Sequence, residues 1–356
     1  ASTTISGTTY YAIQPYDNTD NTWNPTSASG TYTTATGTGY AMAKATAGTV
    51  GFTGVPSQKT NVSKALTENK SGGGSGDRWN LIANPFPAYL ALNAAAKNAS
   101  GASVSLLWYN ATSVDVLGYT DSEEGIWYWD GDSYETANNS SSAAWAAPGQ
   151  AFFVSAPSGG STFSFRSGSI TTQASIVSGG VGDGDDFIEN NPMDPDDRAE
   201  LFIGINQNDI SRRTQIYFIE EGTDELDEGS DTRTFPMGDN NTSIYSRLVE
   251  GDQGIDMSIQ SLAYSEMWDK VIPIGVNAMA GEELNLNVTH KTTPADLKIY
   301  LEDTEEGTFT LINNDAFTLV PASDLEGIGR FYIHLTSDTL SDGDVNTSLL
   351  NAYKEV

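Results

Sequence analysis

The fold is decided by residues 77–89, which read Asp-Arg-Trp-Asn-Leu-Ile-Ala-Asn-Pro-Phe-Pro-Ala-Tyr. Over 79–83, Trp79, Leu81 and Ala83 alternate with Asn80 and Ile82. This period of two predicts a short strand. Proline supplies no N–H to a sheet and keeps the residue before it extended, so Pro85 and Pro87 end the strand. We interpret the segment as a stiff corner in which Phe86 plugs a buried strand end. It contains no nucleophile, base or metal-ligand cluster.

Short runs of aromatic and β-branched residues recur on both sides of this corner, separated by Gly, Asn, Asp, Ser and Pro. The chain of 356 residues holds 35 Gly, 16 Tyr, 13 Phe and 7 Trp, a composition typical of β-sandwiches. We predict an all-β protein built of two antiparallel β-sandwich domains in tandem, jelly-roll or immunoglobulin-like. The exception is 89–97, where an alanine-rich run predicts a helix because alanine has the highest helix propensity.

A break in composition separates the two predicted domains. Residues 179–198 are rich in Asp and Gly and contain two prolines. We therefore predict four parts. They are an aromatic- and glycine-rich sandwich over 1–172, an acidic linker over 173–198, an acidic sandwich over 199–340 and a C-terminal tail over 341–356.

The charge is strongly negative and unevenly distributed. The net charge is −30. Residues 1–170 hold 11 acidic and 7 basic side chains, so 171–356 hold the remaining 36 and 10. Such a surface repels nucleic acid and anionic lipid, so neither is expected as a partner. No run of about 18 apolar residues is present, and we expect no membrane insertion.

Two absences narrow the possible chemistry. The chain has no cysteine, which excludes disulfides, thiolate metal sites and cysteine nucleophiles. His290 and His334 are the only histidines, and no G-x-S-x-G elbow of a serine hydrolase is present. A glycosidase needs two positioned carboxylates, and 47 acidic residues do not single out a pair. We predict that the protein is not an enzyme.

Four aromatic residues are candidates for stacking on sugar rings, because rings beside Asp and Asn are typical of carbohydrate sites. They are Trp23, Tyr128, Trp129 and Trp145. The alternative is that these rings are structural: Trp23 would anchor a loop, and the alternation around the others would turn most of them toward the core.

The acidic linker contains the candidate metal ligands Asp183, Asp185 and Asp186. Closely spaced carboxylates resemble oxygen-rich loops that bind Ca²⁺, although the spacing of an EF-hand is absent. The alternative is a solvated linker, and no other cofactor is expected.

The N-terminal segment 3–13 is a candidate for assembly. An extended segment can add a strand to the sheet of a neighbouring molecule. We take Thr8, Tyr10 and Ile13 as the residues of such a donor strand.

The sequence resembles secreted surface proteins of Bacteroidota at several places in the same order. The stretch RWNLIANPFPAYL, which begins at Arg78, resembles their GWNLIGNPYPS signature. GTGYAMAKATAGTVGFTGV before it and APGQAFFVSAPSGGSTFSFR after it also have counterparts. So do AELFIGINQNDISRRTQIYFIEEGTDELDEGSDT, SIYSRLVEGDQGIDMSIQSL, IPIGV, IYLEDTEEGTFTLI and RFYIHL.

The resemblance implies a cargo of the type IX secretion system. In such proteins an adhesin-like region precedes a C-terminal sorting domain that is removed at the cell surface, so we expect a mature, processed form. It also implies O-glycosylation at Thr339, because Asp338-Thr339-Leu340 fits the short pattern that Bacteroidota use for this modification.

These observations predict a non-catalytic extracellular or cell-surface protein with a structural or adhesive role. One version is a self-assembling filament subunit joined by β-strand addition. The alternative is a carbohydrate-binding adhesin module, or an accessory domain of a larger secreted enzyme. The expected partners are a second copy of the chain or surface glycans, and the secretion machinery during export.

Overall fold

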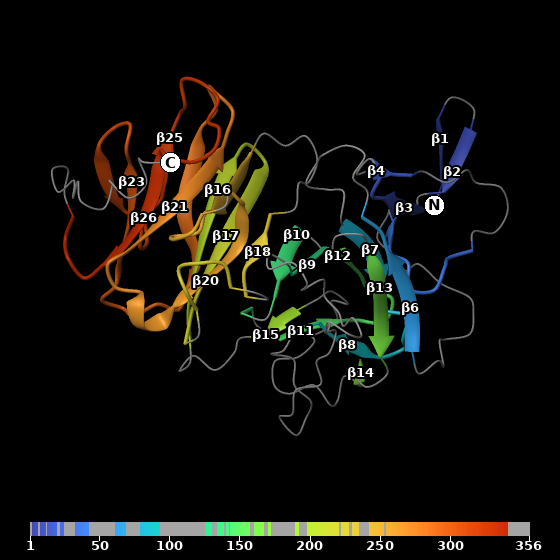
Figure 1. The fold of residues 1–356 in the computed structure, drawn as a ribbon. Helices are drawn as coiled ribbons and strands as arrows, with labels where there is room; N and C mark the ends of the chain where they lie inside the picture. Colours follow the sequence, from blue (N-terminus) through green and yellow to red (C-terminus); the bar gives the residue numbers. More distant parts are fainter. Residues whose placement is uncertain are drawn as a thin grey trace. The chain divides into compact units, whose positions relative to one another are not determined.

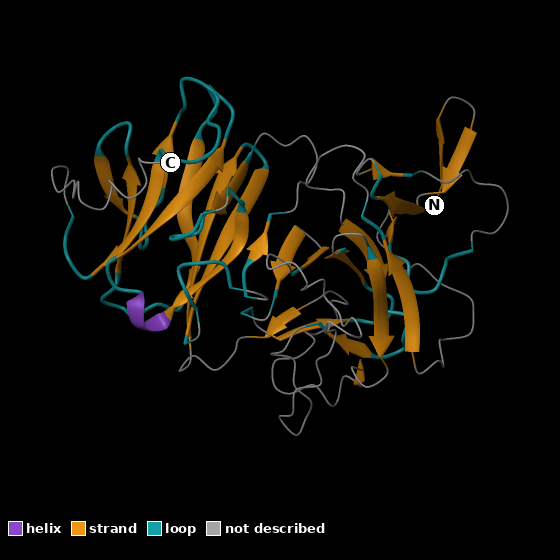
Figure 2. Ribbon diagram, in the orientation of Figure 1, coloured by secondary structure: helices purple, strands orange, loops and turns teal. Residues whose placement is uncertain are grey.

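The protein is all-β in its computed structural model, shown as a ribbon in Figures 1 and 2. The structure describes residues 2–5, 8–11, 13–19, 22–24, 33–42, 61–68, 79–92, 125–129, 134–138, 140–141, 143–156, 160–166, 170–171, 189–191, 198–220, 222–227, 230–234, 242–252 and 254–340. Within these ranges the helical structure is one turn of 3₁₀-helix, η3 (Tyr264–Glu266), drawn in purple in Figure 2. None of the described helical segments is long and apolar enough to cross a membrane.

The chain divides into two compact units. Unit 1 comprises residues 1–193 and 228–236, and unit 2 comprises residues 194–227 and 237–356. Unit 1 contains the strands β1 (Ser2–Ile5), β2 (Thr8–Tyr11), β3 (Ile13–Asp17), β4 (Thr22–Trp23), β5 (Tyr40–Met42), β6 (Asn61–Leu66), β7 (Trp79–Ala83), β8 (Tyr89–Ala91), β9 (Ile126–Trp129), β10 (Tyr134–Ala137), β11 (Ala143–Ala146), β12 (Ala151–Ser155), β13 (Ser161–Arg166), β14 (Ile170–Thr171), β15 (Glu189–Asn191) and β18 (Thr232–Arg233).

Apart from β18, these strands form several small sheets rather than one. Two four-stranded sheets have the orders β10-β9-β12-β7 and β14-β8-β11-β15, β4-β3-β5 is a three-stranded sheet, and β13-β6 and β1-β2 are pairs. The core of the unit gathers Ile82 and Phe152 from the first sheet, Leu90 from the second, and Phe163 and Phe165 from β13. Each of these side chains is at most 1% exposed.

The segment that decides the fold has the predicted structure. β7 pairs along its whole length with β12, from Trp79 opposite Ser155 to Ala83 opposite Ala151. Phe86 follows at the corner and is 3% exposed, so the predicted aromatic plug is confirmed.

Asn84 connects this corner to the turn before β12. Its side-chain Nδ2 donates to the carbonyl oxygens of Ala88, Ala146 and Ala147 at 2.8, 3.0 and 3.1 Å. Its Oδ1 accepts from the backbone N–H of Phe86 at 3.0 Å. Since a buried amide must satisfy all its polar atoms, the asparagine that ends the strand also fixes the path of a distant turn.

The alanine-rich run does not begin as a helix. Tyr89–Ala91 is the strand β8, whose Leu90 lies opposite Ala146 of β11 and opposite Ile170 of β14. Leu90 is fully buried. The gain from burying it in a sheet outweighs the alanine preference for helix, because helix propensity contributes well under about 1 kcal/mol per residue. The predicted helix is wrong at this end, and residues 93–97 lie outside the described part of the chain.

Residues 124–134 read in the sequence as a hairpin that turns at Asp130-Gly131. The pairing of β9 with β10 confirms the hairpin but not its tight turn. Trp129 lies opposite Tyr134, so the connection spans 130–133 rather than the two residues Asp130-Gly131 that favour a tight hairpin.

Unit 2 contains β16 (Arg198–Gln207), β17 (Ile210–Ile219), β19 (Ser243–Ser246), β20 (Met257–Ala263), η3, β21 (Lys270–Asn277), β22 (Leu284–Lys291), β23 (Lys298–Asp303), β24 (Thr308–Leu311), β25 (Phe317–Leu319) and β26 (Phe331–Thr336). They form one curved sheet in the order β24-β23-β26-β21-β19-β20-β17-β16-β22-β25. The sheet is nearly closed and barrel-like, and it encloses one continuous apolar core.

The hairpin β16–β17 is the longest pairing in this sheet. Ala199, Leu201 and Ile203 point to the core, as their alternation predicts. The sequence predicts that 199–205 and 213–219 pair as strands joined by 206–212. This pairing is confirmed, but the strands extend further and leave only Asn208 and Asp209 as the turn. Asn208 has a φ of 55°, a left-handed conformation that asparagine tolerates better than most residues.

One neighbouring pair departs from the predicted antiparallel pattern. β17 and β20 run parallel, with Gln215 opposite Ile259. Parallel neighbours need a long crossover connection, and residues 220–256 provide one.

Candidate functional site

A row of aromatic rings crosses one face of the sheet β10-β9-β12-β7 in unit 1. Trp129 contacts Tyr134 with ring centroids 5.0 Å apart, and Tyr134 lies 6.2 Å from Phe153. Phe153 then contacts Tyr16 at 4.9 Å and Trp23 at 6.1 Å. The contacts are edge-to-face or tilted, a geometry that adds stability beyond simple burial. The row therefore holds its five rings in fixed orientations.

The row contains two of the four aromatic residues singled out in the sequence. Trp23 is half-buried and contacts Tyr16 edge-on at 5.5 Å. Trp129 is 42% exposed at the other end of the row. A stacking role for these two residues stays a prediction.

The other two stacking candidates lie in the interior. Tyr128 and Trp145 are 2% and 4% exposed, so neither ring presents a face to a ligand. Tyr128 points to the opposite face of β9 from Trp129, as the period of a strand requires. Trp145 belongs to β11, in the other four-stranded sheet.

A polar groove of about 380 Å³ lies next to Tyr16. We call it the β3–β6–β7 groove, because β3 with the turn after it, the end of β6, and β7 supply its lining. Asn18 donates from Nδ2 to the carbonyl oxygen of Thr67 at 2.8 Å. Asn80 pairs with the backbone of Thr67 through both ends of its amide, each at 3.0 Å. The three sides of the groove are therefore joined by direct hydrogen bonds.

Two oppositely charged side chains lie in the groove lining. Lys64 donates from Nζ to Thr38 Oγ1 at 2.6 Å. Asp17 accepts from the backbone N–H of Thr19 at 2.9 Å and from Asn24 Nδ2 at 2.8 Å. Hydrogen bonds from Thr19, first from its side chain and then from its backbone, lower the pKa of Asp17 below its ordinary value of 3.8. The carboxylate is therefore ionised at neutral pH and acts as a hydrogen-bond acceptor.

The proposed assembly residues lie at the N-terminal end of unit 1. Thr8 and Tyr10 belong to β2, which pairs with β1 so that Tyr10 lies opposite Thr3. Ile13 begins β3 and pairs with Met42 of β5 in a different sheet. The three residues therefore do not lie on one strand.

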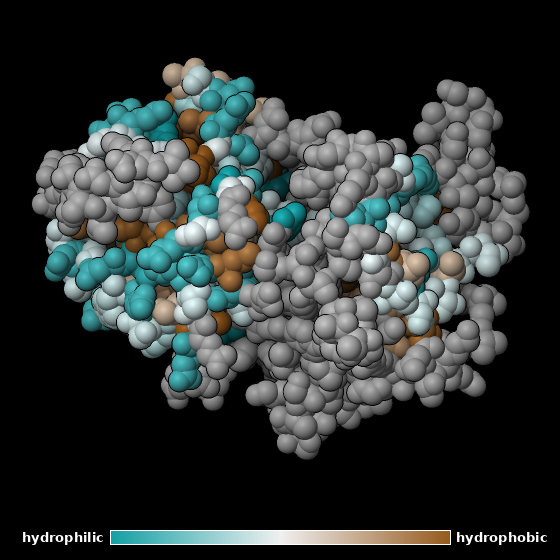
Figure 3. Space-filling model, in the orientation of Figure 1, coloured by the Kyte–Doolittle hydropathy of each residue, from teal (hydrophilic) through white to brown (hydrophobic). Residues whose placement is uncertain are grey.

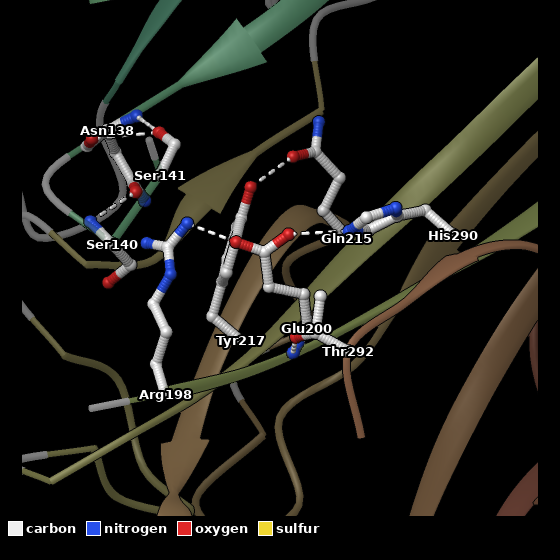
Figure 4. Close-up of polar contacts among 9 residues, drawn as sticks. All are labelled: Asn138, Ser140, Ser141, Arg198, Glu200, Gln215, Tyr217, His290 and Thr292. Atoms are coloured by element: carbon white, nitrogen blue, oxygen red, sulfur yellow. Dashed lines mark hydrogen bonds and ion pairs between the residues drawn. The ribbon is translucent and has the colours of Figure 1, made fainter. Parts of the chain in front are cut away.

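A buried carboxylate in unit 2 has two partners (Figure 4). Glu200 contacts Arg198 through Oε1 and His290 Nε2 through Oε2, the latter at 2.8 Å. The guanidinium of Arg198 also lies over the ring of Tyr217, 4.9 Å from its centre. The backbone N–H of Glu200 donates to Thr292 Oγ1 at 2.9 Å.

The second histidine forms a similar pair on the same sheet. His334 Nε2 lies 2.7 Å from Glu302 Oε2. Neither histidine has a hydroxyl nucleophile among the hydrogen-bond partners found for its ring in the described residues. A triad of the Ser-His-Asp type needs a nucleophile in addition to the His–carboxylate contact.

A second buried polar group, in unit 1, also serves the fold (Figure 4). Asn138 is fully buried, and its Oδ1 accepts from the backbone N–H of Ser140 at 2.9 Å. Ser141 Oγ donates to the carbonyl oxygen of Asn138 at 2.8 Å. The amide of Asn138 continues to Thr232 Oγ1 at 2.9 Å, so it joins two distant segments of unit 1.

No group of three or more potential metal ligands occurs among the residues that the structure describes. The predicted calcium ligands Asp183, Asp185 and Asp186 lie outside those residues. Thr339, the predicted glycosylation site, is exposed, and its Oγ1 accepts from Lys298 Nζ at 2.8 Å. Its modification stays a prediction.

The described surface of unit 2 is largely hydrophilic on the face drawn in Figure 3, with separate hydrophobic patches. Tyr264 and Trp268 are exposed near η3, and Leu311, Val320 and Ile328 are exposed elsewhere in the unit. Isolated exposed apolar side chains are normal on a protein surface.

Sequence reasoning missed the β3–β6–β7 groove. Asp17, Asn18 and Asn24 lie in a segment that looked like an ordinary polar loop. A signal was nevertheless present, because these residues adjoin Tyr16 or Trp23, and aromatic rings beside Asn and Asp are the pattern used to single out Trp23.

The fold and the groove define a class: an all-β protein whose strand ends and turns frame a polar groove. The chain belongs to the family described as Domain of unknown function (DUF8693), which it matches over residues 2–334. Searches of curated proteins and of solved structures find no match.

Proposed function

We propose that the protein is a non-catalytic, extracellular surface protein with a structural or adhesive role, which assembles with copies of itself by β-strand addition. The resemblance to secreted surface proteins of Bacteroidota supports the location and export by the type IX system. The all-β fold and the absence of a nucleophile beside either described histidine support a role without catalysis. Two tandem antiparallel sandwiches, over 1–172 and 199–340, are the finer architecture in this proposal.

The observation that carries the proposal is the isolation of the N-terminal hairpin. In the part of the chain that the structure describes, β1 and β2 form a two-stranded sheet that pairs with no further strand. A hairpin of two strands is marginally stable alone in water. Each of its outer edges carries backbone N–H and C=O groups that a neighbouring strand can bind.

The composition of the hairpin suits strand addition. β1 reads Ser-Thr-Thr-Ile and β2 reads Thr-Thr-Tyr-Tyr. β-Branched and aromatic residues favour strands, and neither strand contains proline or a charged side chain, the features that protect sheet edges from pairing. In this proposal, the outer edge of the β1–β2 hairpin binds a strand of a second copy of the chain.

The test compares assembly of the full chain with three variants, by negative-stain microscopy and light scattering, with and without Ca²⁺. We expect ordered polymers from the full chain. Removal of residues 1–11 and Tyr10→Pro should abolish them, because proline lacks the N–H that a ladder needs. Tyr10→Val is the matched control and should assemble, because valine keeps the preference for strand.

A monodisperse monomer of the full chain in every condition would contradict the proposal. So would polymers that persist after removal of residues 1–11, because assembly would then use another surface. A polymer that forms only with Ca²⁺ would support assembly and add a metal requirement.

A further inference from the structure

We propose that the β3–β6–β7 groove binds a neutral saccharide, with Asp17 and Lys64 contacting its hydroxyl groups and Tyr16 forming an apolar wall. This inference is independent of self-assembly, because the groove uses no residue of the hairpin β1–β2. It assigns a ligand class to residues outside the four aromatic positions suggested by the sequence.

Hydrogen bonds between its walls hold the β3–β6–β7 groove in shape. Asn18 and Asn80 both bond to Thr67, so the turn after β3, the end of β6 and β7 cannot separate without breaking hydrogen bonds. The amide of Asn18 also donates to Thr67 Oγ1 at 2.9 Å. A preformed site binds more tightly because little ordering entropy is lost when the ligand enters.

One wall of the groove is aromatic. Tyr16 lines the groove, and its ring is fixed edge-on against Trp23 at 5.5 Å and Phe153 at 4.9 Å. A ring held in this way presents apolar surface at little cost in side-chain entropy. Sugars have both apolar C–H surface and hydroxyl groups, so they suit a polar groove with one aromatic wall.

The groove lining balances opposite charges and offers both donors and acceptors of hydrogen bonds. Asp17 and Lys64 are the charged side chains among the described lining residues, and their charges are opposite. An ammonium has three donors and Thr38 accepts from one, so Lys64 can donate further. An ionised carboxylate has several lone pairs, and Asp17 can accept from more groups than Thr19 and Asn24. A hydroxyl both donates and accepts, so it can bind to either side chain.

The volume of the groove suits a small ligand. A groove of about 380 Å³ lies at the lower end of the range of about 300–1,000 Å³ found for small-molecule sites. One or two sugar units match this size better than a long chain. The single lysine and the net charge of −30 disfavour phosphorylated or sulfated ligands, which need several cations.

The test measures binding of defined sugars to the full chain by isothermal titration and by saturation-transfer NMR. The probes are glucose, galactose, mannose, N-acetylglucosamine, lactose and cellobiose, with glucuronic acid and glucosamine as charged comparators. We expect at least one neutral sugar to bind with a Kd on the order of 1 mM or tighter, and both charged comparators to bind more weakly. Binding of the chain to the same sugars displayed on beads is measured as well. Binding to the beads points to a surface glycan as the natural source, and binding to the free sugar alone points to a free sugar.

Two variants locate the site. Asp17→Ala removes the acceptor, and Lys64→Met removes the donor while keeping a long side chain, so each should weaken binding at least about tenfold. Asp209→Ala, at an exposed turn of unit 2, is the matched control and should bind as the unaltered chain does. Thermal unfolding of each variant checks that the fold is retained, and Lys64→Met carries the test if Asp17→Ala does not fold.

The inference is overturned if no neutral sugar binds the unaltered chain, if glucuronic acid is the preferred ligand, or if Lys64→Met binds as tightly as Asp209→Ala. Loss of assembly in Tyr10→Pro with sugar binding unchanged would support both proposals separately. Sugar binding without any polymer would leave the groove in place and remove only the filament.

Discussion

His334 Nε2 lies 2.7 Å from Glu302 Oε2, and the two side chains are 16% and 6% exposed. They come from the neighbouring strands β26 and β23, where Glu302 lies opposite Tyr332. The other histidine, His290, contacts a carboxylate that also has a cationic partner, since Glu200 pairs with Arg198 as well. The two His–Glu pairs therefore differ in how much each carboxylate depends on its histidine.

We expect His334→Ala to destabilise unit 2 by about 2–3 kcal/mol, because it leaves a buried carboxylate without its partner. His290→Ala is the matched control and should cost less, since Arg198 still neutralises Glu200 and the His290 side chain is 43% exposed. Denaturant unfolding of both variants gives the two free energies.

Adding Glu302→Gln to His334→Ala should recover part of the loss, because a neutral amide costs less to bury than an unpaired carboxylate. Equal losses for His334→Ala and His290→Ala would show that Arg198 does not compensate, and would contradict this account.

Tyr332 makes the free energy of unfolding depend on pH in the alkaline range. Burial raises its pKa above the ordinary value of 10.0, and the negative charge of Glu302 raises it further. The folded state therefore keeps the phenolic proton at a pH where the unfolded chain has lost it. The free energy of unfolding falls as the pH rises above 10.0 toward the folded pKa.

We expect Tyr332→Phe to unfold at a higher alkaline pH than the unaltered chain, while the two differ much less at neutral pH. Circular dichroism during a titration with base measures the midpoint. Tyr264→Phe is the control, because Tyr264 is 42% exposed. A larger upward shift for Tyr264→Phe than for Tyr332→Phe would refute the argument.

Arg330 holds a carboxylate that is almost completely buried. Its Nε and Nη2 contact the two oxygens of Asp303 at 2.9 and 2.7 Å, and the Asp303 side chain is 1% exposed. Asp303 Oδ1 also accepts from the backbone N–H of Glu305 at 3.1 Å, so the pair supports the turn between β23 and β24.

Arg330→Lys should cost about 1–3 kcal/mol of unfolding free energy, because an ammonium cannot bind both carboxylate oxygens in this planar geometry. Arg212→Lys, near the turn of the β16–β17 hairpin, should change stability by less than about 0.5 kcal/mol. The prediction fails if the two lysine variants unfold at the same denaturant concentration.

Asn84→Asp tests the corner that ends β7. The substitution keeps the shape of the side chain but replaces its donor Nδ2 with an acceptor, which then faces the carbonyl oxygens of Ala88, Ala146 and Ala147. We expect a loss of about 3 kcal/mol or more at neutral pH, because buried carbonyls lose their donor and meet an acceptor.

Part of that loss should return at acidic pH, where the introduced carboxyl group is protonated and can donate one hydrogen bond. Asn24→Ala is the control, since Asn24 is exposed and contacts Asp17; it should cost less than about 0.5–1 kcal/mol. An Asn84→Asp protein as stable as Asn24→Ala would mean that the corner does not depend on this amide.

The sequence alone determined the elements whose signals are local. The period of two over 79–83 and in β16 predicts strands, because neighbouring side chains of a strand point to opposite faces. The prolines after Asn84 predict the corner, since they cannot continue a ladder. The hairpin around Gly307 was also predictable, and Gly307 has the positive φ of 65° that such turns require.

Only the tertiary structure decided which strands are neighbours. Nothing local shows that β17 pairs parallel with β20, or that Tyr89–Ala91 leaves its alanine-rich context to join a sheet. Asn18 meets Thr67 across 49 positions of sequence, and Asn84 meets Ala146 across 62. The physical reason is that sheet pairing is selected by burial of complementary faces from distant segments, a term larger than any local propensity. The β3–β6–β7 groove arises where three such segments meet, so it could not be located from any one of them.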